Sequence, residues 1–159
     1  LTSCRANIFP LYFGAKHVKM PMVRAGGGVI LQIGSVSAFQ AGSISKPDHG
    51  MFKLATFNLI NKLSQALAAD NIRANMVSPG FINDPDDAEG FETRLTQRMG
   101  AGSQDEAVAG YTKSNIPLGR PATSEEVAQL CLFLCGPHAA YITGQNLLVD
   151  GGYTKGMSI

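Results

Sequence analysis

Residues 29–55 read VILQIGSVSAFQAGSISKPDHGMFKLA, and this stretch decides the fold. It opens with a continuous apolar run over residues 29–33, which is typical of a strand buried on both faces of a parallel sheet. Small and polar residues then form a predicted loop over residues 34–48, and a helical pattern starts at His49. The order of strand, loop and helix predicts one unit of an α/β layered protein.

Three side chains of this stretch can converge on one point. His49 and Lys53 are four residues apart, so on a helix they lie on the same face, one turn from each other. Ser35 follows the strand and can sit opposite that face. A hydroxyl, an imidazole and an ammonium group together suit acid/base chemistry. The alternative is a helix start with a surface histidine and a lysine whose stem covers apolar surface.

The rest of the chain alternates predicted helices with predicted strands. Helices are expected over residues 1–24, 49–69 and 123–134, and strands over residues 72–77 and 145–149. Asp48 is the expected N-cap of the second helix. This order predicts an α/β fold with a parallel sheet.

One long excursion interrupts the alternation. Residues 81–116 are irregular, rich in acidic side chains, and contain one or two short predicted helices. An excursion of this length after a strand is often a lid over a site, although a solvated insertion is an equal alternative. We therefore expect a single domain over residues 1–159 with a lid insertion over residues 81–116. The glycines of residues 25–28 precede a strand, which predicts a tight turn and not a phosphate loop.

The composition excludes several classes of protein. The 159 residues are 45% hydrophobic and 16% charged, as in a compact folded domain. The net charge of +1 gives no basic field for nucleic acid or a membrane surface. No apolar run is long enough to span a membrane, and we expect a cytoplasmic protein. The three cysteines, Cys4, Cys131 and Cys135, are predicted to be thiols without a metal.

Motifs in all of these segments together resemble the C-terminal portion of the short-chain dehydrogenase/reductase family. Each motif is weak alone, but their order and spacing along nearly the whole chain are specific. They are Asn7, Ile33-Gly34-Ser35, Lys53, Ile72-Arg73-Ala74-Asn75-Met76-Val77-Ser78-Pro79-Gly80, Pro117-Leu118-Gly119-Arg120, Glu125-Glu126-Val127-Ala128, Ile142-Thr143-Gly144-Gln145 and Val149-Asp150-Gly151-Gly152. The resemblance implies a partial Rossmann-like, doubly wound parallel sheet that lacks the N-terminal dinucleotide-binding half.

The resemblance also implies a catalytic group of Asn, Ser, Tyr and Lys. Asn7, Ser35 and Lys53 match the first, second and fourth members, but His49 occupies the position of the tyrosine. By position in the sequence, no tyrosine lies near enough to substitute. An altered site is therefore expected, with His49 beside Lys53 as a general base whose pKa is lowered by the like charge.

Two further departures concern the nicotinamide cofactor of the family. The sequence has no glycine-rich dinucleotide loop, and such a loop supplies the backbone cradle for the pyrophosphate. Asp84 stands where the family usually has a threonine that contacts the nicotinamide carboxamide. Phe81, Ile82 and Asp84 are therefore expected to face substrate beneath the lid. We expect no cofactor; if NAD(P) does bind, Lys53 is the residue that contacts it.

Three functions remain open. The first is non-redox acid/base catalysis on a carbonyl-bearing small molecule, giving isomerisation, dehydration, cyclisation or aldol-type chemistry. The second is an NAD(P)-dependent oxidoreductase whose N-terminal half is missing or supplied by another chain. The third is an inactive partner subunit of an active paralogue. The resemblance implies a homodimer or homotetramer, paired through the helices that carry Asn7 and Lys53 and through the last helix and strand.

Overall fold

Three strands and five α-helices make up the fold in the computed structural model, which describes residues 2–40, 47–82 and 91–155. The α-helices are α1 (Thr2–Arg24), α2 (Pro47–Leu67), α3 (Phe91–Met99), α4 (Gln104–Asn115) and α5 (Ser124–Cys135). The strands are β1 (Gly28–Ile33), β2 (Ile72–Pro79) and β3 (Asn146–Val149), and short 3₁₀ helices are η1 (Val36–Ala38), η2 (Ala68–Asp70) and η3 (Pro137–Ala139).

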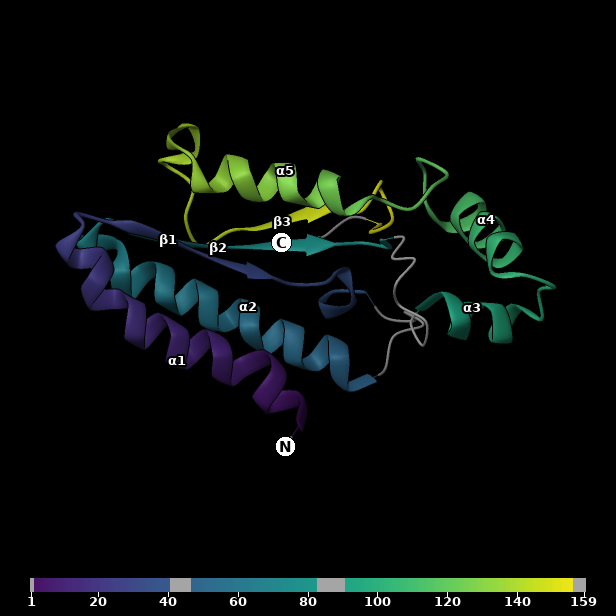
Figure 1. The fold of residues 1–159 in the computed structure, drawn as a ribbon, viewed down its shortest axis with the longest axis horizontal. Coiled ribbons are helices and arrows are strands. Elements are labelled where there is room, and N and C mark those ends of the chain that lie inside the picture. Colours follow the sequence, from purple (N-terminus) through teal and green to yellow (C-terminus); the bar gives the residue numbers. More distant parts are fainter. Residues whose placement is uncertain (1, 41–46, 83–90, 156–159) are drawn as a thin grey trace.

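The strands form one parallel sheet in the order β1-β2-β3. Gly28 is in register with Ile72, and Met76 with Asn146. Helices α1 and α2 cover one face of the sheet and α5 covers the other, while α3 and α4 lie beyond the carboxyl ends of the strands (Figure 1). This arrangement confirms the predicted α/β fold with a partial, Rossmann-like parallel sheet.

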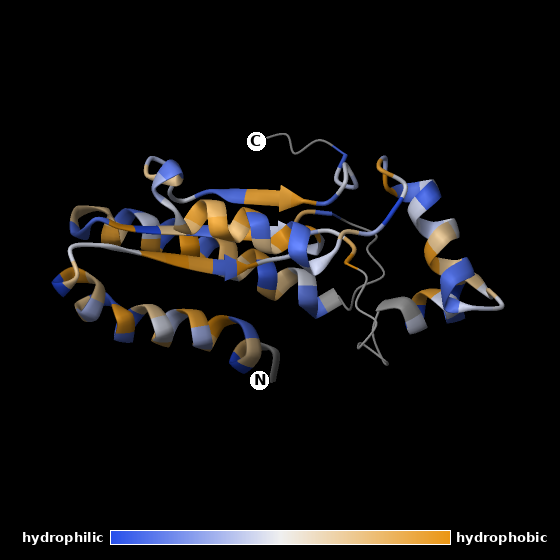
Figure 2. Cartoon of the chain, turned by 45° about the horizontal axis from the view of Figure 1, so that its top comes forward, coloured by the Kyte–Doolittle hydropathy of each residue, from blue (hydrophilic) through white to orange (hydrophobic). Residues whose placement is uncertain are grey.

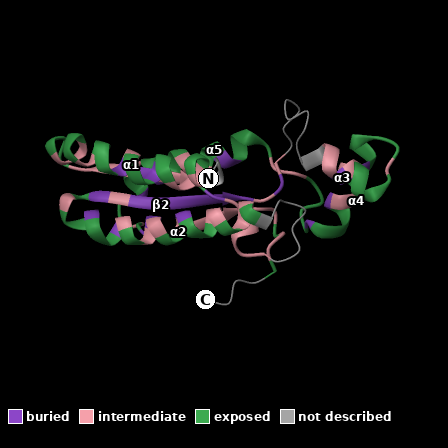
Figure 3. Cartoon of the chain, turned by 90° about the horizontal axis from the view of Figure 1, so that it is seen from below, coloured by how far each residue is buried: buried purple, intermediate pink, exposed green. Residues whose placement is uncertain are grey.

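The hydrophobic core lies on both faces of β2, which is buried between the helix layers (Figure 3). Ile60 of α2 packs in one cluster with Ile72 and Met76, and Leu134 of α5 packs in a second cluster with Val77. β1 and β3 are also apolar strands, whereas the helices alternate apolar and polar residues (Figure 2). An apolar run flanked by helices on both faces is what a central parallel strand requires.

The buried polar side chain of Asn75 on β2 forms hydrogen bonds with backbone groups. The side-chain amide of Asn75 donates to the Ile142 carbonyl at 2.8 Å and accepts from the Gln145 amide at 3.0 Å. These bonds join β2 to the loop that leads into β3. Asn75 is therefore a structural residue.

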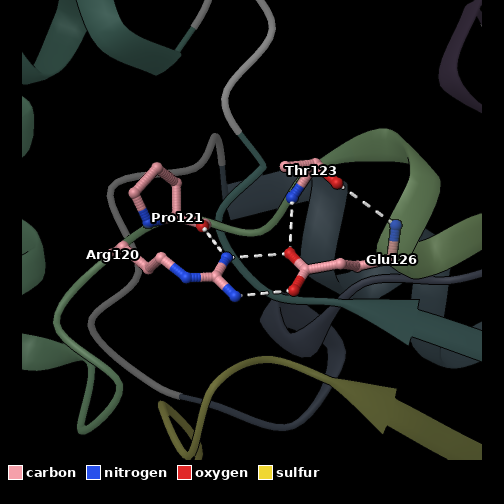
Figure 4. A network of polar contacts seen from close by, with 4 residues as sticks. All are labelled: Arg120, Pro121, Thr123 and Glu126. Atoms are coloured by element: carbon pink, nitrogen blue, oxygen red, sulfur yellow. Dashed lines mark hydrogen bonds and ion pairs between the residues drawn. The ribbon is translucent and has the colours of Figure 1, made fainter.

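Helix α5 begins with a capping box. The Thr123 hydroxyl accepts from the Glu126 amide at 3.2 Å, and the Glu126 carboxylate accepts from the Thr123 amide at 2.9 Å. Arg120 adds a two-pronged ion pair to the same carboxylate, at 2.6 and 2.9 Å (Figure 4). The bond from Arg120 is the main cause that lowers the pKa of Glu126 to about 2.

Some local details differ from the sequence-based expectations. Asp48 lies inside the first turn of α2 and does not precede it, because the helix already begins at Pro47. The glycines before β1 form the predicted turn, since Gly26 and Gly27 have φ angles of 82° and 145°. Within the described ranges no helix is long and apolar enough to cross a membrane, and no group of three or more metal-ligating side chains comes together.

Candidate active site

A pocket of about 490 Å³ lies where the three parallel strands end. The segments that follow β1, β2 and β3 all contribute to its wall, as do α2, α3 and α4. Ligands of open parallel α/β sheets bind at this edge. Its lining residues are Ile33, Gly34, Ser35, Val36, Ser37, His49, Lys53, Pro79, Gly80, Phe81, Ile82, Arg94, Tyr111 and Tyr153.

Ser35 enters the pocket from the loop after β1. It is the N-cap of η1, and its hydroxyl oxygen accepts from the Ser37 amide at 3.2 Å and from the Ser37 hydroxyl at 2.8 Å. Ser35 is the acceptor in both bonds, so its own O–H is the donor that it can offer to a substrate oxygen. The short 3₁₀ helix thereby fixes where this donor sits.

Lys53 and His49 come from the first two turns of α2. The Lys53 ammonium donates to the Ile33 carbonyl at 3.0 Å, which ties α2 to the end of β1. Burial lowers the pKa of Lys53. Burial also lowers the pKa of His49, and the charges of Lys53 and Arg94 lower it further while Asp48 opposes them. This direction agrees with the one expected for His49, but burial contributes more to it than the like charge does.

Three further residues of the pocket were not expected there from the sequence. Tyr111 of α4, Tyr153 after β3 and Arg94 of α3 all line it. The two phenol oxygens are 2.5 Å apart, and burial together with this hydrogen bond raises the pKa of Tyr111. Tyr111 was considered too distant along the chain, but α3 and α4 return beyond the strand ends and bring it to the same pocket as Ser35. The expectation of a lid was the one signal that could have indicated it.

The structure brings together only some of the predicted site residues. Ser35, His49, Lys53, Phe81 and Ile82 share the pocket. Asn7 lies in α1 and is not among the lining residues. Asp84 lies outside the described residues.

The Phe81 segment is held in place by its neighbours. The Phe81 carbonyl accepts from the Ala122 amide at 2.9 Å, and Ile82 is bridged to Ala122. The Phe81 ring meets the Tyr111 ring edge to face, with centroids 6.1 Å apart. These contacts connect the end of β2 to α4 and to the start of α5.

The parallel sheet with helices on both faces is Rossmann-like, and Ser35, His49 and Lys53 line a pocket at its carboxyl edge. The family model described as enoyl-(acyl carrier protein) reductase matches residues 2–154. The chain belongs to the short-chain dehydrogenase/reductase family.

Individual relatives agree with this assignment. A 3-oxoacyl-[acyl-carrier-protein] reductase from Chlamydia pneumoniae is 35% identical over 148 residues, which are 93% of this chain and 54% of the relative. A tropinone reductase homolog from Arabidopsis thaliana is 39% identical over 138 residues, covering 84% of this chain and 40% of the relative. The L-sorbose reductase from Gluconobacter frateurii, solved with NADPH and L-sorbose, superposes with a TM-score of 0.80 at 31% identity over 90% of this chain and 53% of that structure.

These findings correct two expectations. The relatives are named as reductases and dehydrogenases, and the sorbose reductase holds NADPH. The hypothesis of non-redox isomerase or cyclase chemistry, with no cofactor, is therefore wrong. It rested on three departures from the family: His49, Asp84 and the lack of a glycine-rich loop. The third carries no weight, because the chain spans only about half the length of the curated relatives it matches.

Proposed function

We propose that this chain forms the substrate-side half of an NAD(P)-dependent oxidoreductase that interconverts an alcohol and a carbonyl group of a small molecule. The observation that carries the proposal is that Ser35, His49 and Lys53 line one pocket at the carboxyl edge of the sheet. In this proposal His49 takes the proton-transfer position that a tyrosine occupies in the family.

The residues present fit the nicotinamide end of such a cofactor. Lys53 has three N–H donors, and one of them is used on the Ile33 carbonyl. The ammonium can therefore also donate to ribose hydroxyls, as the family resemblance implies. When bound, the cofactor supplies hydride chemistry, which no side chain can supply.

The chain's own residues would handle the oxygen and its proton. The Ser35 hydroxyl would donate to the substrate oxygen and stabilise the negative charge that develops there. In the oxidation direction neutral His49 would remove the hydroxyl proton, and in the reduction direction protonated His49 would return it. Burial, and after it the charge of Lys53, would hold the imidazole pKa low, which favours the base form at neutral pH.

Binding and turnover with three variants test this proposal. The purified protein, with both halves of the fold present, is titrated with NADH and NADPH, following cofactor fluorescence, and turnover is then measured with a panel of ketones and alcohols. Lys53→Met should weaken cofactor binding at least about tenfold, whereas Lys53→Arg should retain part of it. His49→Gln should leave cofactor affinity within about twofold and reduce turnover at least about 100-fold.

Two results would contradict the proposal. Neither nucleotide binds to the wild-type protein when both halves of the fold are present, or His49→Gln retains full turnover. Cofactor binding without any dependence of turnover on His49 would instead indicate a partner subunit that supports catalysis elsewhere.

A further inference from the structure

A pair of tyrosines forms part of the wall of the active-site pocket. Tyr111 and Tyr153 both line it, and their phenol oxygens are 2.5 Å apart. In the proposed reaction Ser35 and His49 handle the substrate oxygen and its proton. The two phenol hydroxyls are therefore polar groups of the pocket to which that reaction gives no role.

Tyr153 is held by the turn that follows β3. The carboxylate of Asp150 accepts from the amides of Gly152 and Thr154, both at 2.9 Å. The Asp150 carbonyl accepts from the Tyr153 amide at 3.0 Å. These three bonds fix the backbone from which the Tyr153 ring extends into the pocket wall.

Tyr111 reaches the same place from α4. Its ring lies 6.1 Å from the Phe81 ring and 6.2 Å from the Tyr153 ring, measured between centroids. Burial and the hydrogen bond with Tyr153 raise the pKa of Tyr111, so this phenol keeps its proton at neutral pH. The Tyr153 oxygen is therefore paired with a neutral hydroxyl and not with a phenolate.

The bond between the two phenols leaves Tyr153 able to bind a further group. A phenol has one proton to donate and an oxygen that can accept. If Tyr111 is the donor of the shared bond, Tyr153 keeps its own proton for a ligand. If Tyr153 is the donor, its oxygen can still accept a proton from a ligand. A ligand hydroxyl suits both cases because it can donate and accept, whereas a ketone oxygen can only accept.

Tyr153 and Ser35 enter the pocket from opposite sides of the sheet edge. Ser35 follows β1 and Tyr153 follows β3, and β2 lies between these strands. Phe81 and Ile82, which follow β2, supply apolar surface to the same pocket. A pocket with polar groups at two sides and apolar surface from the strand between them suits a carbon chain that carries two oxygens. The volume of about 490 Å³ has room for such a ligand.

We propose that the substrate is a hydroxy ketone of several carbons, and that Tyr153 binds its hydroxyl group while the ketone lies at Ser35 and His49. This inference rests on the proposed function, because that function places the ketone. Tyr153 is then a specificity-determining residue, which contacts the substrate away from the reacting atoms. The pocket should bind hydroxy ketones about three- to tenfold more tightly than plain ketones, as expected for one neutral hydrogen bond.

Two pairs of matched probes test the inference without requiring turnover. The first pair is 4-hydroxybutan-2-one with pentan-2-one, and the second is 1-hydroxypropan-2-one with butan-2-one. Within each pair the ketone is the same and a methyl group replaces the hydroxyl. Dissociation constants are measured by ligand-observed NMR titration of the protein with both halves of the fold present. We expect the hydroxy ketone to bind more tightly in at least one pair, and equal affinities within both pairs would overturn the inference.

Three conservative variants assign the contact. Tyr153→Phe removes the hydroxyl and keeps the ring, so it should abolish the preference and leave the affinity for the plain ketone unchanged. Tyr111→Phe breaks the pair but leaves the Tyr153 hydroxyl, so it should retain part of the preference. Tyr141→Phe makes the same chemical change at a fully exposed tyrosine and should retain all of it.

Two outcomes with these variants would also overturn the inference. One is a loss of preference in Tyr111→Phe that equals or exceeds the loss in Tyr153→Phe, because the contact would then not belong to Tyr153. The other is a Tyr153→Phe variant that binds both members of a pair more weakly to the same extent, because the hydroxyl would then only support the structure. An unchanged affinity for the plain ketone shows that a variant is folded.

Failure of this inference can be told apart from failure of the proposed function. Equal affinities within both pairs, in a protein whose turnover depends on His49, overturn the hydroxyl contact and leave the oxidoreductase in place. A preference that depends on Tyr153, in a protein that binds neither nucleotide, supports the hydroxyl contact and rejects the oxidoreductase.

Discussion

At the scale of single residues, the substitution of imidazole for phenol changes how the site can handle a proton. A phenol releases its proton only near pH 10 unless its surroundings lower the pKa, whereas imidazole titrates near about pH 6.5. In this pocket burial and the neighbouring charges lower the pKa of His49 still further. At neutral pH the side chain is therefore mainly a neutral base, which suits removal of an alcohol proton better than donation to a carbonyl.

The pH dependence of the two directions follows from this protonation state. For alcohol oxidation, kcat/KM should rise with pH and level off above the pKa of His49, at a midpoint below about pH 6.5. For carbonyl reduction it should fall about tenfold per pH unit above that same pKa, because the imidazolium form becomes rare. Initial rates in both directions between pH 5 and pH 9 measure this.

His49→Tyr provides the control for that profile. A phenol loses its proton at higher pH, so the acidic limb of the oxidation profile should move upward by more than one pH unit. An unchanged midpoint in His49→Tyr would show that another group transfers the proton. Tyr111 is the next group to examine in that case, because it lines the same pocket.

At the scale of elements, the start of α5 is held by a local network of hydrogen bonds among Arg120, Thr123 and Glu126. Thr123→Ala removes the acceptor for the Glu126 amide and should lower the free energy of unfolding by about 1 kcal/mol. Thr123→Ser keeps a hydroxyl and should lose only a small fraction of that. Chemical denaturation followed by circular dichroism measures both, and equal stability of Thr123→Ala and the wild type would show that the cap contributes nothing.

The same network predicts how stability varies in acid. The pKa of Glu126 falls from 4.5 to about 2, mainly through Arg120. A carboxyl group with a depressed pKa stabilises the fold above its unfolded-state pKa, and this contribution is lost as the pH falls from 4.5 towards about 2. Glu126→Gln should therefore have a lower free energy of unfolding than the wild type at pH 7. The free energies of unfolding of the two proteins, measured by chemical denaturation, should converge near pH 2.

Helices and strands with strong local patterns could be predicted from the sequence. Only some of the residues that line the pocket could be predicted in this way. The apolar run before Gly34 and the capping box at Thr123 depend on neighbouring residues, so their elements follow from spacing. Ser35, His49 and Lys53 were found because they flank one strand and one helix. Arg94 and Tyr153 reach the pocket through tertiary contacts from segments that are distant in the sequence, and no local period marks such positions.

At the scale of the whole molecule, helix α1 exposes a cluster of aromatic side chains. Phe9, Tyr12 and Phe13 are 43%, 51% and 48% exposed, and their rings form edge-to-face pairs. Single exposed apolar residues are common, but a contiguous aromatic cluster is typical of an interaction surface. The family resemblance implies pairing through this helix, and the cluster supports that expectation.

We therefore expect the purified protein to self-associate through α1. Tyr12→Glu introduces a charge into the aromatic cluster and should weaken association at least about tenfold, because burying an unpaired carboxylate costs several kcal/mol. Leu118→Glu, at a site that is 68% exposed in the loop before α5, is the matched control and should leave association unchanged. Sedimentation velocity over a range of concentrations measures both variants. A wild-type protein that remains monomeric, or a Tyr12→Glu variant with the wild-type association constant, would exclude the α1 face as the contact, and the aromatic cluster would then require a partner other than a second copy.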